Sequence, residues 1–405
     1  MNPMQSRAGK TVTVQPGGYL AFDPSPLPPE PPLRQDKEFT SALYSATLAL
    51  GRLSGLSRLL PNPDLFVAMY VRREALLSSR IEGIESTLTD VLRHEESNDE
   101  SKAGEPADVA KVVNYVRAIN LGIEKLGTTQ LSMDMLRELH GVLLENDPRG
   151  ESRIGHYRDE PNWIGAKGST LMNAQFVPPP PDRMLMSIEN LDYYIRESQD
   201  APVLIQAGLA HAQFQTVHPF FDGNGRIGRL LIALMLHASK TLDKPLLYLS
   251  HYFLQNRIEY TDRLTAVRSN GDWEGWMKFF LQGVQATADD AVARSARIID
   301  LRIETLAAAG KLKHRASRLV EFLFAHPIVT VKSIERDLGI SDDTAIAALR
   351  ELEAAGILRE QTGRKRGRVY VFERYVEILE ADSGPPPAIA MAPLISGQPP
   401  ARSPQ

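Results

Sequence analysis

The stretch TVHPFFDGNGRIGRLL, residues 216–231, places a histidine, a carboxylate, an asparagine, three glycines and two arginines between two apolar segments. Gly223 and Gly225 bracket Asn224, and a strong helical pattern follows them directly. Glycines there let successive backbone amides turn inward, and the N-terminus of a helix adds the positive end of its dipole. The stretch therefore predicts a backbone site for an anion, and phosphate is the expected ligand.

Four charged or titratable side chains surround this predicted anion site. Arg226 and Arg229 are three residues apart and share a helical face, so two guanidiniums indicate more than one phosphate group. Asp222 would repel a polyphosphate unless Mg²⁺ bridged the two, because Mg²⁺ takes one or two carboxylates together with substrate oxygens. His218 titrates near neutrality and can take a proton from an attacking hydroxyl. A loop that only capped a helix would need none of these side chains.

The composition excludes several classes of protein. At 405 residues the chain has room for two or three domains. A net charge of −4 with 24% charged residues gives no overall attraction to nucleic acid or to an anionic membrane. The absence of cysteine excludes disulfides, thiol catalysis and thiolate zinc sites. No apolar run has the length of a signal peptide or of a membrane-spanning helix, so we expect a soluble, cytoplasmic protein without membrane contact.

Apolar residues recur three and four positions apart over most of the chain, which predicts a mainly α fold. The helical patterns cover 36–86 with a break at 61–64, 108–126, 132–145, 182–198, 203–217, the residues after 225, and 251–308. Prolines at 24–32 predict an extended segment, and the polar residues 94–106 predict a surface connector. Residues 154–177 mix aromatic and β-branched residues with turn formers, which predicts a hairpin or flap.

A compact unit follows the charged stretch GKLKHR. Its helical patterns at 316–325, 331–337 and 342–355 precede ILREQ and RVYVF, two expected strands joined by the turn TGRKRG. This order of elements is typical of a winged helix-turn-helix.

The winged helix raises the question of DNA binding. Residues 311–374 hold thirteen Lys or Arg and nine Asp or Glu, a local balance of +4, and GRKRGR in the wing could follow a phosphate backbone. The expected recognition helix begins with Asp342 and Asp343, and acid at the end that enters the major groove argues against base readout. A role in docking or presenting a target is therefore favoured, and a nucleotide-sensing, DNA-binding transcriptional regulator stays open as the alternative.

The central stretch matches the Fic motif at every fixed position: HPF, one variable residue, DGNGR, two variable residues and a final arginine, residues 218–229. The chain also resembles Fic proteins in AGLAHAQFQTV just upstream, in YRDEPNWIG followed by FVPPPP, in the proline-rich lead-in and in the terminal winged helix. The resemblance covers roughly residues 20–375. It implies a Fic-type helical bundle with a β-hairpin flap, joined to a small C-terminal winged helix-turn-helix domain.

The resemblance implies a protein adenylyltransferase, which moves AMP from ATP to a Ser, Thr or Tyr hydroxyl of a protein, the chain itself included. In this family's terms His218 would be the base, and Asp222 would hold Mg²⁺ between the α and β phosphates. The implied nucleotide-binding residues are Gly223, Asn224, Gly225, Arg226, Ile227, Gly228, Arg229, Tyr260 and Thr261. The last two stand where the family often has two adjacent tyrosines near the adenine, so only the first tyrosine is retained. Dimers are frequent among relatives, so a homodimer is expected.

A second family motif lies upstream, in LLSSRIEG. Ser78, Glu82 and Gly83 match the inhibitory pattern of a serine or threonine, three residues, glutamate and glycine or asparagine. By itself such a segment is more often a solvated helix face. With the Fic motif downstream, the resemblance implies that Glu82 pairs with Arg229 and excludes the γ phosphate, which would make the enzyme autoinhibited. The same glutamate could instead orient a water that removes AMP from a modified protein.

The resemblance also assigns the flap and divides the chain. Residues Asn162, Trp163, Ile164 and Gly165 would align a segment of the target by strand addition. The expected parts are a Pro-rich extended lead-in at 1–35, an N-terminal helical region with the inhibitory motif at 36–107, a Fic catalytic core at 108–310, a winged helix-turn-helix at 311–375 and a disordered tail at 376–405.

Overall fold

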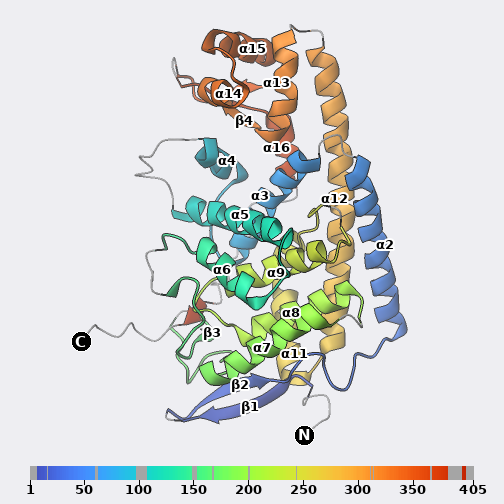
Figure 1. Cartoon of the computed structure of the whole chain (residues 1–405), viewed down its shortest axis with the longest axis vertical. Helices are drawn as coiled ribbons and strands as arrows, with labels where there is room; N and C mark the ends of the chain where they lie inside the picture. The colour runs from blue at the N-terminus through green and yellow to red at the C-terminus, as the bar shows by residue number, and fades with distance from the viewer. Residues whose placement is uncertain are drawn as a thin grey trace, which may run out of the picture.

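The computed structural model describes residues 7–15, 17–59, 63–96, 107–147, 153–166, 168–198, 201–242, 244–310, 312, 314–364, 367–381 and 395–397. Helices make up most of this part of the chain, with a two-stranded hairpin at one end of the molecule and the winged helix at the other (Figure 1). The prediction of a mainly α fold is therefore confirmed. No helix among the described residues is both long and apolar enough to cross a membrane. Most of the predicted connector, residues 97–106, lies outside the described residues.

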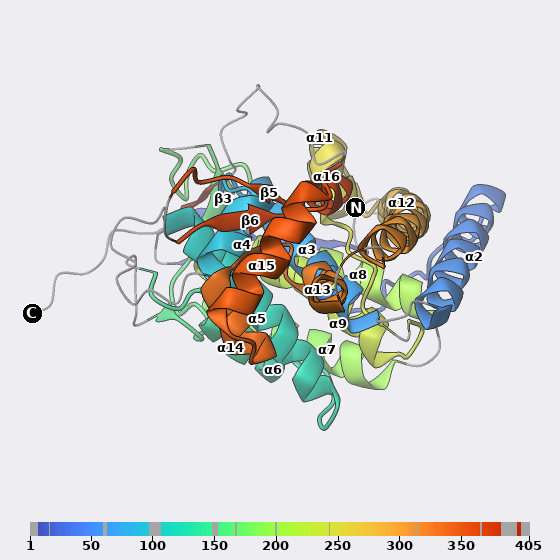
Figure 2. The same cartoon turned by 90° about the horizontal axis from the view of Figure 1, so that it is seen from above.

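Two long helices, α2 (Lys37–Leu59) and α12 (Trp273–Ala309), lie side by side along one flank of the molecule in both views (Figures 1 and 2). Helix α12 begins with a side-chain cap, because a carboxylate oxygen of Asp272 accepts a hydrogen bond from the Gly275 amide at 3.0 Å. Helix α3 (Pro63–Ile81) ends just before Gly83, whose φ of 79° is the left-handed conformation that glycine tolerates. The helix therefore ends before residue 86, where the predicted helical pattern ends.

The centre of the molecule is the helix pair α8 (Val203–Val217) and α9 (Asn224–Ala238), which pack against each other. The surrounding helices are α5 (Ala107–Leu126), α6 (Met133–Leu143), α7 (Pro181–Glu197), α10 (Ser250–Gln255) and α11 (Arg257–Asn270). Almost every side chain of α8 is buried, as expected for a helix that is apolar all round. Gly228 makes the close approach of α9 possible, since a Cβ there would lie 2.4 Å from Nε2 of Gln215.

The winged helix docks on the helical core rather than standing apart from it. It comprises α13 (His314–Ala325), β4 (Ile328–Thr330), α14 (Val331–Leu338), α15 (Asp342–Ala354), β5 (Arg359–Glu360), β6 (Val369–Val371) and α16 (Glu373–Glu380). Its three strands pair in the order β4, β6, β5. Helices α13 and α16 contact α3 and α12, and β4 contacts α4 (Leu88–Glu96), so the unit lies beside the segment that carries Glu82. The sequence prediction of a winged helix is confirmed, although it missed β4 and α16.

Three predictions about the ends and the flap are wrong in part. The lead-in contains an antiparallel hairpin of β1 (Gly9–Val14) and β2 (Tyr19–Pro24), although the residues from 25 to 36 form neither helix nor strand. The tail is not wholly without structure, because α16 runs to Glu380 and β7 (Ile395–Gly397) forms a strand. The flap is not a regular hairpin: β3 (Trp163–Gly165) is bridged to Phe176 only through Ile164, and its partner strand is β7. Strands β3 and β7 pair although they lie far apart in the sequence, and local patterns do not reveal such a pairing.

Candidate active site

The loop between α8 and α9 is fixed by its own backbone and by one side chain. His218 ends α8 in the left-handed region, at φ 49° and ψ 60°, and Gly223 takes φ 76° immediately before α9 begins. The amide of Asn224 donates from Nδ2 to the Phe220 carbonyl at 2.7 Å, and its Oδ1 accepts from the Phe220 amide at 2.9 Å. The side chain of Asn224 therefore holds the loop, which leaves its backbone amide to face a ligand.

His218 is buried, and its surroundings keep the imidazole neutral. Burial is the largest cause that lowers the pKa of His218 to about 3, and the nearby cations Arg158 and Arg268 lower it further. The prediction that His218 titrates near neutrality is therefore wrong, because the imidazole is neutral at physiological pH. A neutral imidazole has one acceptor nitrogen, which a general base needs. His218 can thus accept a proton without first having to lose one.

Arg158 is a structural residue of the site that the sequence did not identify. Its buried guanidinium donates from Nε to the His218 carbonyl at 2.9 Å, and from its two terminal nitrogens to the carbonyls of Val217, Pro179 and Glu160. One cation therefore joins the end of α8 to the flap and to the proline run that follows it. The pKa of Arg158 is lowered to about 10 by burial, so it still carries its charge at neutral pH.

Replacing Arg158 with alanine is expected to lower the free energy of unfolding by about 3 kcal/mol. The substitution leaves several buried carbonyls without a donor, and hydrogen bonds to a charged group are each worth about 1.5–3 kcal/mol. Urea unfolding followed by circular dichroism measures the change. Arg117→Ala is the matched control, because half of the Arg117 side chain is exposed and such surface pairs contribute about 0–1 kcal/mol. Equal effects of the two substitutions would contradict this role.

Asp222 is held at the mouth of the predicted anion site by its neighbours. One of its carboxylate oxygens accepts from the Gly223 amide at 2.7 Å. Its carbonyl lies 3.0 Å from Nε2 of His140, whose Nδ1 accepts from the Gly155 amide at 3.1 Å. Because Nδ1 is an acceptor, Nε2 carries the proton and donates to Asp222. His140 also stacks on Phe220, with ring centroids 3.9 Å apart, so this unpredicted histidine positions the carboxylate.

The residues of the predicted inhibitory motif meet the last arginine of the Fic motif. Arg229 donates from Nη2 to a carboxylate oxygen of Glu82 at 2.8 Å, from Nε to the hydroxyl of Ser78 at 2.8 Å, and from Nη2 to the Ser78 carbonyl at 2.9 Å. The Arg229 side chain is 2% exposed and that of Glu82 is 34% exposed. A Cβ built on Gly225 would lie 2.0 Å from the same Glu82 oxygen. The Glu82 carboxylate thus lies over the turn that was predicted to bind an anion.

Arg226 and Arg229 do not share one environment, although they are three residues apart. Arg229 lines the cavity described below, whereas Arg226 is buried and is not among the described residues that line it. Within the described part of the chain, Nε and Nη1 of Arg226 have no hydrogen-bond partner. The Arg226 carbonyl accepts from the hydroxyl of Tyr115 at 3.3 Å. Of the two predicted arginines, only Arg229 therefore lines the cavity.

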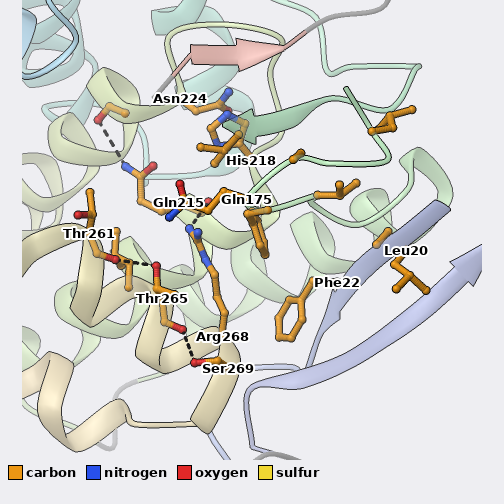
Figure 3. Close-up of a pocket in the computed structure, with 18 of the residues that line it drawn as sticks. Leu20, Phe22, Gln175, Gln215, His218, Asn224, Thr261, Thr265, Arg268 and Ser269 are labelled. Carbon is orange, nitrogen blue, oxygen red and sulfur yellow. Dashed lines mark hydrogen bonds between the residues drawn. The ribbon is translucent and has the colours of Figure 1, made fainter. Parts of the chain in front are cut away.

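A cavity of about 830 Å³ contains most of the predicted site. His218 and Asn224 lie at one end of it, Thr261, Thr265 and Ser269 of α11 form one wall, and Leu20 and Phe22 of β2 lie on the far side (Figure 3). The remaining predicted residues that line it are Asp222, Gly223, Gly225, Arg229, Tyr260, Glu82 and Ile164. The structure thus brings together residues from five separate segments of the chain. Arg268, which was not predicted, also lines the cavity, and its guanidinium carbon lies 4.0 Å from the ring centroid of Phe176.

Tyr260 is tied to the Fic motif through a buried histidine. His211 lies 2.7 Å from the Gly228 carbonyl through Nδ1 and 2.8 Å from the Tyr260 hydroxyl through Nε2. The carbonyl can only accept, so Nδ1 donates to it and Nε2 accepts from the tyrosine. His211 therefore fixes Tyr260 at the cavity wall. Thr261 lines the same wall, where its hydroxyl donates to the Ile258 carbonyl at 2.8 Å.

The folded protein is expected to lose stability as the pH falls below about 6.5. Burial lowers the pKa of His140 to about 4 and those of His211 and His218 to about 3. In the unfolded chain each has a pKa of about 6.5, so below that pH the unfolded state binds protons that the folded state excludes. The loss approaches about 1.4 kcal/mol per pH unit for each histidine. The urea midpoints of unfolding at about pH 7.5 and pH 5.5 measure this loss of stability. Equal midpoints at the two pH values would contradict the conclusion that the three histidines are buried in the neutral form.

The flap residues are anchored to the loop that carries His218. Asn162 is buried and donates from Nδ2 to the Phe220 carbonyl at 3.0 Å. Trp163 donates from its indole nitrogen to the Ser169 carbonyl at 2.9 Å. Gly165 lies against Ser169, whose hydroxyl would be 2.7 Å from a Cβ at that position. The flap therefore has a defined position relative to the loop that carries His218.

The donor set at the site fits a magnesium ion held jointly with a nucleotide. No cluster of three or more histidine or acidic side chains able to hold a metal occurs among the described residues. Asp222 supplies one carboxylate in the cavity beside the backbone amides of the anion site. One protein carboxylate is enough when phosphate oxygens and water complete the octahedron.

Parts of this chain are similar to known protein families and proteins. Residues 40–124 match the Fic/DOC family N-terminal region, residues 130–236 match the Fic/DOC family, and residues 317–370 match a helix-turn-helix DNA-binding domain. A "Probable protein adenylyltransferase" of Aquifex aeolicus is 35% identical over 66 residues, which are 16% of this chain and 21% of that protein. Protein adenylyltransferase fic-1 of Caenorhabditis elegans is 27% identical over 127 residues, 31% of this chain and 23% of that protein. The matched region thus spans less than a quarter of either relative.

A solved structure shares the fold over most of the chain. The crystal structure of a Fic family protein from Desulfovibrio desulfuricans superposes with a TM-score of 0.54 and 19% identity, covering 84% of this chain and 97% of that one. The sequence motif, the matched domains and the shared fold lead to the same assignment. The chain thus carries a Fic/DOC-family N-terminal region at residues 40–124, a Fic/DOC-family domain at residues 130–236 and a C-terminal helix-turn-helix domain at residues 317–370.

Proposed function

We propose that the chain is a protein adenylyltransferase, which transfers AMP from ATP to a Ser, Thr or Tyr hydroxyl of a protein. The observation that carries the proposal is that a neutral His218 shares one cavity with the backbone turn of Gly223 and Gly225 and with the guanidinium of Arg229. The names of the partly matching relatives support it. Catalysis of nucleotidyl transfer depends mainly on positioning the reactants and on neutralising the charge of the phosphates, and the residues of this cavity would do both.

The residues of the site divide the chemistry among them. The hydroxyl oxygen of the target attacks the α-phosphorus of ATP, the bond from that phosphorus to the β-phosphate oxygen breaks, and pyrophosphate leaves. His218 takes the hydroxyl proton. Asp222 would hold Mg²⁺, which neutralises charge on the phosphates when it is bound. Backbone amides of Asn224, Gly225 and Arg226 in the first turn of α9 would face the phosphates, whereas the Ile227 amide donates to the Gly223 carbonyl at 3.0 Å.

The two arginines and the wall of α11 complete the proposed nucleotide site. Arg226, whose buried Nε and Nη1 have no hydrogen-bond partner among the described residues, and Arg229 would bind the β and γ phosphates. Tyr260 and Thr261 would lie near the adenine. Residues 108–310 would then form the catalytic core, and residues 36–107 would supply the inhibitory segment.

We also propose that the enzyme is autoinhibited. The Glu82 carboxylate accepts a hydrogen bond from the Arg229 guanidinium and covers Gly225. It therefore lies where the end of the triphosphate would bind. A carboxylate and a phosphate repel each other in this position. ATP can therefore bind productively only after Glu82 has moved.

Incubation with ATP labelled on the α phosphate or on the γ phosphate tests the proposed function. Transfer of AMP retains the α label on protein and releases the γ label with pyrophosphate. Labelling of protein from γ-labelled ATP alone would indicate a kinase and would contradict the proposal. The magnesium requirement is measured in the same assay by adding a chelator, which should stop incorporation.

A further inference from the structure

The cavity that contains His218 continues beyond the proposed nucleotide site onto the hairpin of β1 and β2. In Figure 3, Thr261 of the α11 wall and Leu20 of β2 lie on opposite sides of His218. Strand β2 and the flap segment after β3 supply the large apolar side chains of this far side, which are Leu20, Phe22, Leu171, Met172 and Phe176. We refer to these five residues as the apolar end of the cavity.

Alternation along β2 turns one face of the strand toward the cavity. The other face is buried in a small apolar cluster of Tyr19, Ala21, Trp163 and Val177. Successive side chains of a strand point to opposite faces, so Leu20 and Phe22 face away from that cluster. Leu20 is 60% exposed and Met172 is 72% exposed. One exposed apolar side chain is ordinary, but several that line one hollow indicate a binding surface.

The hairpin is attached to the flap and to the helical core, which gives the apolar end a defined position. The Phe22 amide donates to the Val177 carbonyl at 2.9 Å. Asp23 of β2 forms an ion pair with Arg183 of α7. The flap is also anchored to the loop that carries His218. The apolar end is therefore a continuation of the flap surface.

Arg268 links the apolar end to the segment that carries His218. Its Nε donates to the Thr216 hydroxyl at 3.2 Å. Its guanidinium carbon lies 4.0 Å from the ring centroid of Phe176, which lies 6.0 Å from that of Phe22. These two steps together are about as long as three residues of extended chain, at about 3.3–3.6 Å each. A target whose hydroxyl lies beside His218 therefore reaches the apolar end about three residues away along its own chain.

The geometry of the transfer decides which reactant lies at this end. The attacking and leaving oxygens lie roughly in line through the phosphorus that is transferred. In the proposed reaction pyrophosphate lies toward Arg229 and Gly225, so the target enters from the opposite side. Among the described residues that line the cavity, Glu82 and Asp222 are the only acids, and both lie at the phosphate end. A basic side chain of the target would thus meet no carboxylate at the apolar end.

We propose that the apolar end is a specificity site for the target, and that it binds a large apolar side chain within about three residues of the hydroxyl that accepts AMP. The inference rests on the proposed function and names the class of its target. Such a side chain leaves water when it binds, and it also covers the exposed surfaces of Leu20 and Met172. Full burial of a leucine or phenylalanine side chain favours binding by about tenfold or more.

Synthetic peptides test the specificity site on the full chain that carries Glu82→Gly. Each peptide has one serine and one test residue, Leu, Phe, Asp or Lys, placed up to three positions from the serine among glycines and alanines. Fluorescence anisotropy measures binding without ATP, and incorporation from ATP labelled on the α phosphate measures transfer. We expect the Leu and Phe peptides to bind at least about tenfold more tightly, and to react with at least about tenfold higher kcat/KM, than the Asp and Lys peptides.

The double substitution Leu20→Glu with Met172→Glu places two carboxylates at the apolar end. Both side chains are largely exposed, so the protein should fold as before and bind ATP as before. The variant should lose the preference for Leu and Phe and should bind the Lys peptide more tightly than the Asp peptide. Met186→Glu is the matched control, because Met186 is 70% exposed on α7 and is not among the described residues that line the cavity. It should keep the preference for Leu and Phe.

The outcomes separate this inference from the proposed function. Absent or equal binding of all the peptides, or a preference for Leu and Phe that survives in the double variant, would overturn the specificity site. A double variant that lost affinity for ATP and kept its peptide binding would place the adenine at the apolar end and would also overturn it. The expected binding preferences, without transfer of AMP to any peptide or protein, would overturn the proposed function and support the specificity site.

Discussion

Replacing His218 with alanine is expected to lower the rate of AMP transfer at least about 100-fold, because general-base catalysis contributes roughly 10²–10⁴-fold. The structure supplies the reason: burial and two nearby cations keep the imidazole neutral, so its acceptor nitrogen is available at physiological pH. The measurement is incorporation of α-labelled AMP into the chain in the Glu82→Gly background. A loss of only a few fold would exclude His218 as the base.

Two controls separate loss of the base from loss of the site. The phosphates are bound by backbone amides and arginines, so His218→Ala should bind ATP with nearly unchanged affinity. His156→Ala removes an exposed histidine from the segment that precedes the flap and should keep full activity. If His218→Ala lost ATP binding as well, the imidazole would have a structural role instead.

Replacing Glu82 with glycine is expected to raise AMP transfer by about 10- to 150-fold. The Glu82 carboxylate accepts a hydrogen bond from the Arg229 guanidinium at 2.8 Å and covers Gly225. A hydrogen bond to a charged group is worth about 1.5–3 kcal/mol, and each 1.4 kcal/mol is a factor of ten in an equilibrium. Removing the carboxylate frees both groups for the triphosphate. The measurement is the initial rate of AMP incorporation at saturating ATP.

Glu82→Gln is the matched variant for the charge. It keeps the length of the side chain and an oxygen that can accept from Arg229, so we expect an increase smaller than that of Glu82→Gly. Equal rates for the original chain and Glu82→Gly would contradict autoinhibition. The same pair of proteins tests removal of AMP: release of AMP from a modified protein that disappears in Glu82→Gly would assign Glu82 to that hydrolysis.

The local parts of the site could be predicted from the sequence. The glycines, the histidine and the carboxylate lie within twelve residues, and the spacing of a turn before a helix fixes how they face one another. The pairing of Glu82 with Arg229 spans 147 residues, and only the resemblance to a family predicted it. Spacing along the chain gives no information on such a contact, because the fold brings α3 to α9.

The supporting residues could not be predicted, because their partners are backbone groups of distant segments. Arg158 binds carbonyls up to 60 residues away, and His140 reaches the Asp222 carbonyl 82 residues downstream. Neither residue belongs to a pattern with a fixed spacing. The hairpin of β1 and β2 is different, since TVTV before PGG and YLAF after it carries the alternation and turn residues of a hairpin. The sequence of the lead-in therefore contains a hairpin signal, although its prolines at 24–32 favour an extended segment.

The intact mass of the Glu82→Gly protein after incubation with ATP and Mg²⁺ tests the account most directly. The account predicts a gain of at least one AMP moiety per chain, a much smaller gain in the original protein over the same time, and no gain when His218→Ala is added. An unchanged mass would contradict AMP transfer by this protein. A gain of the same size with and without His218 would contradict the role of His218 as the base, and an equal gain in the original protein would contradict restraint by Glu82.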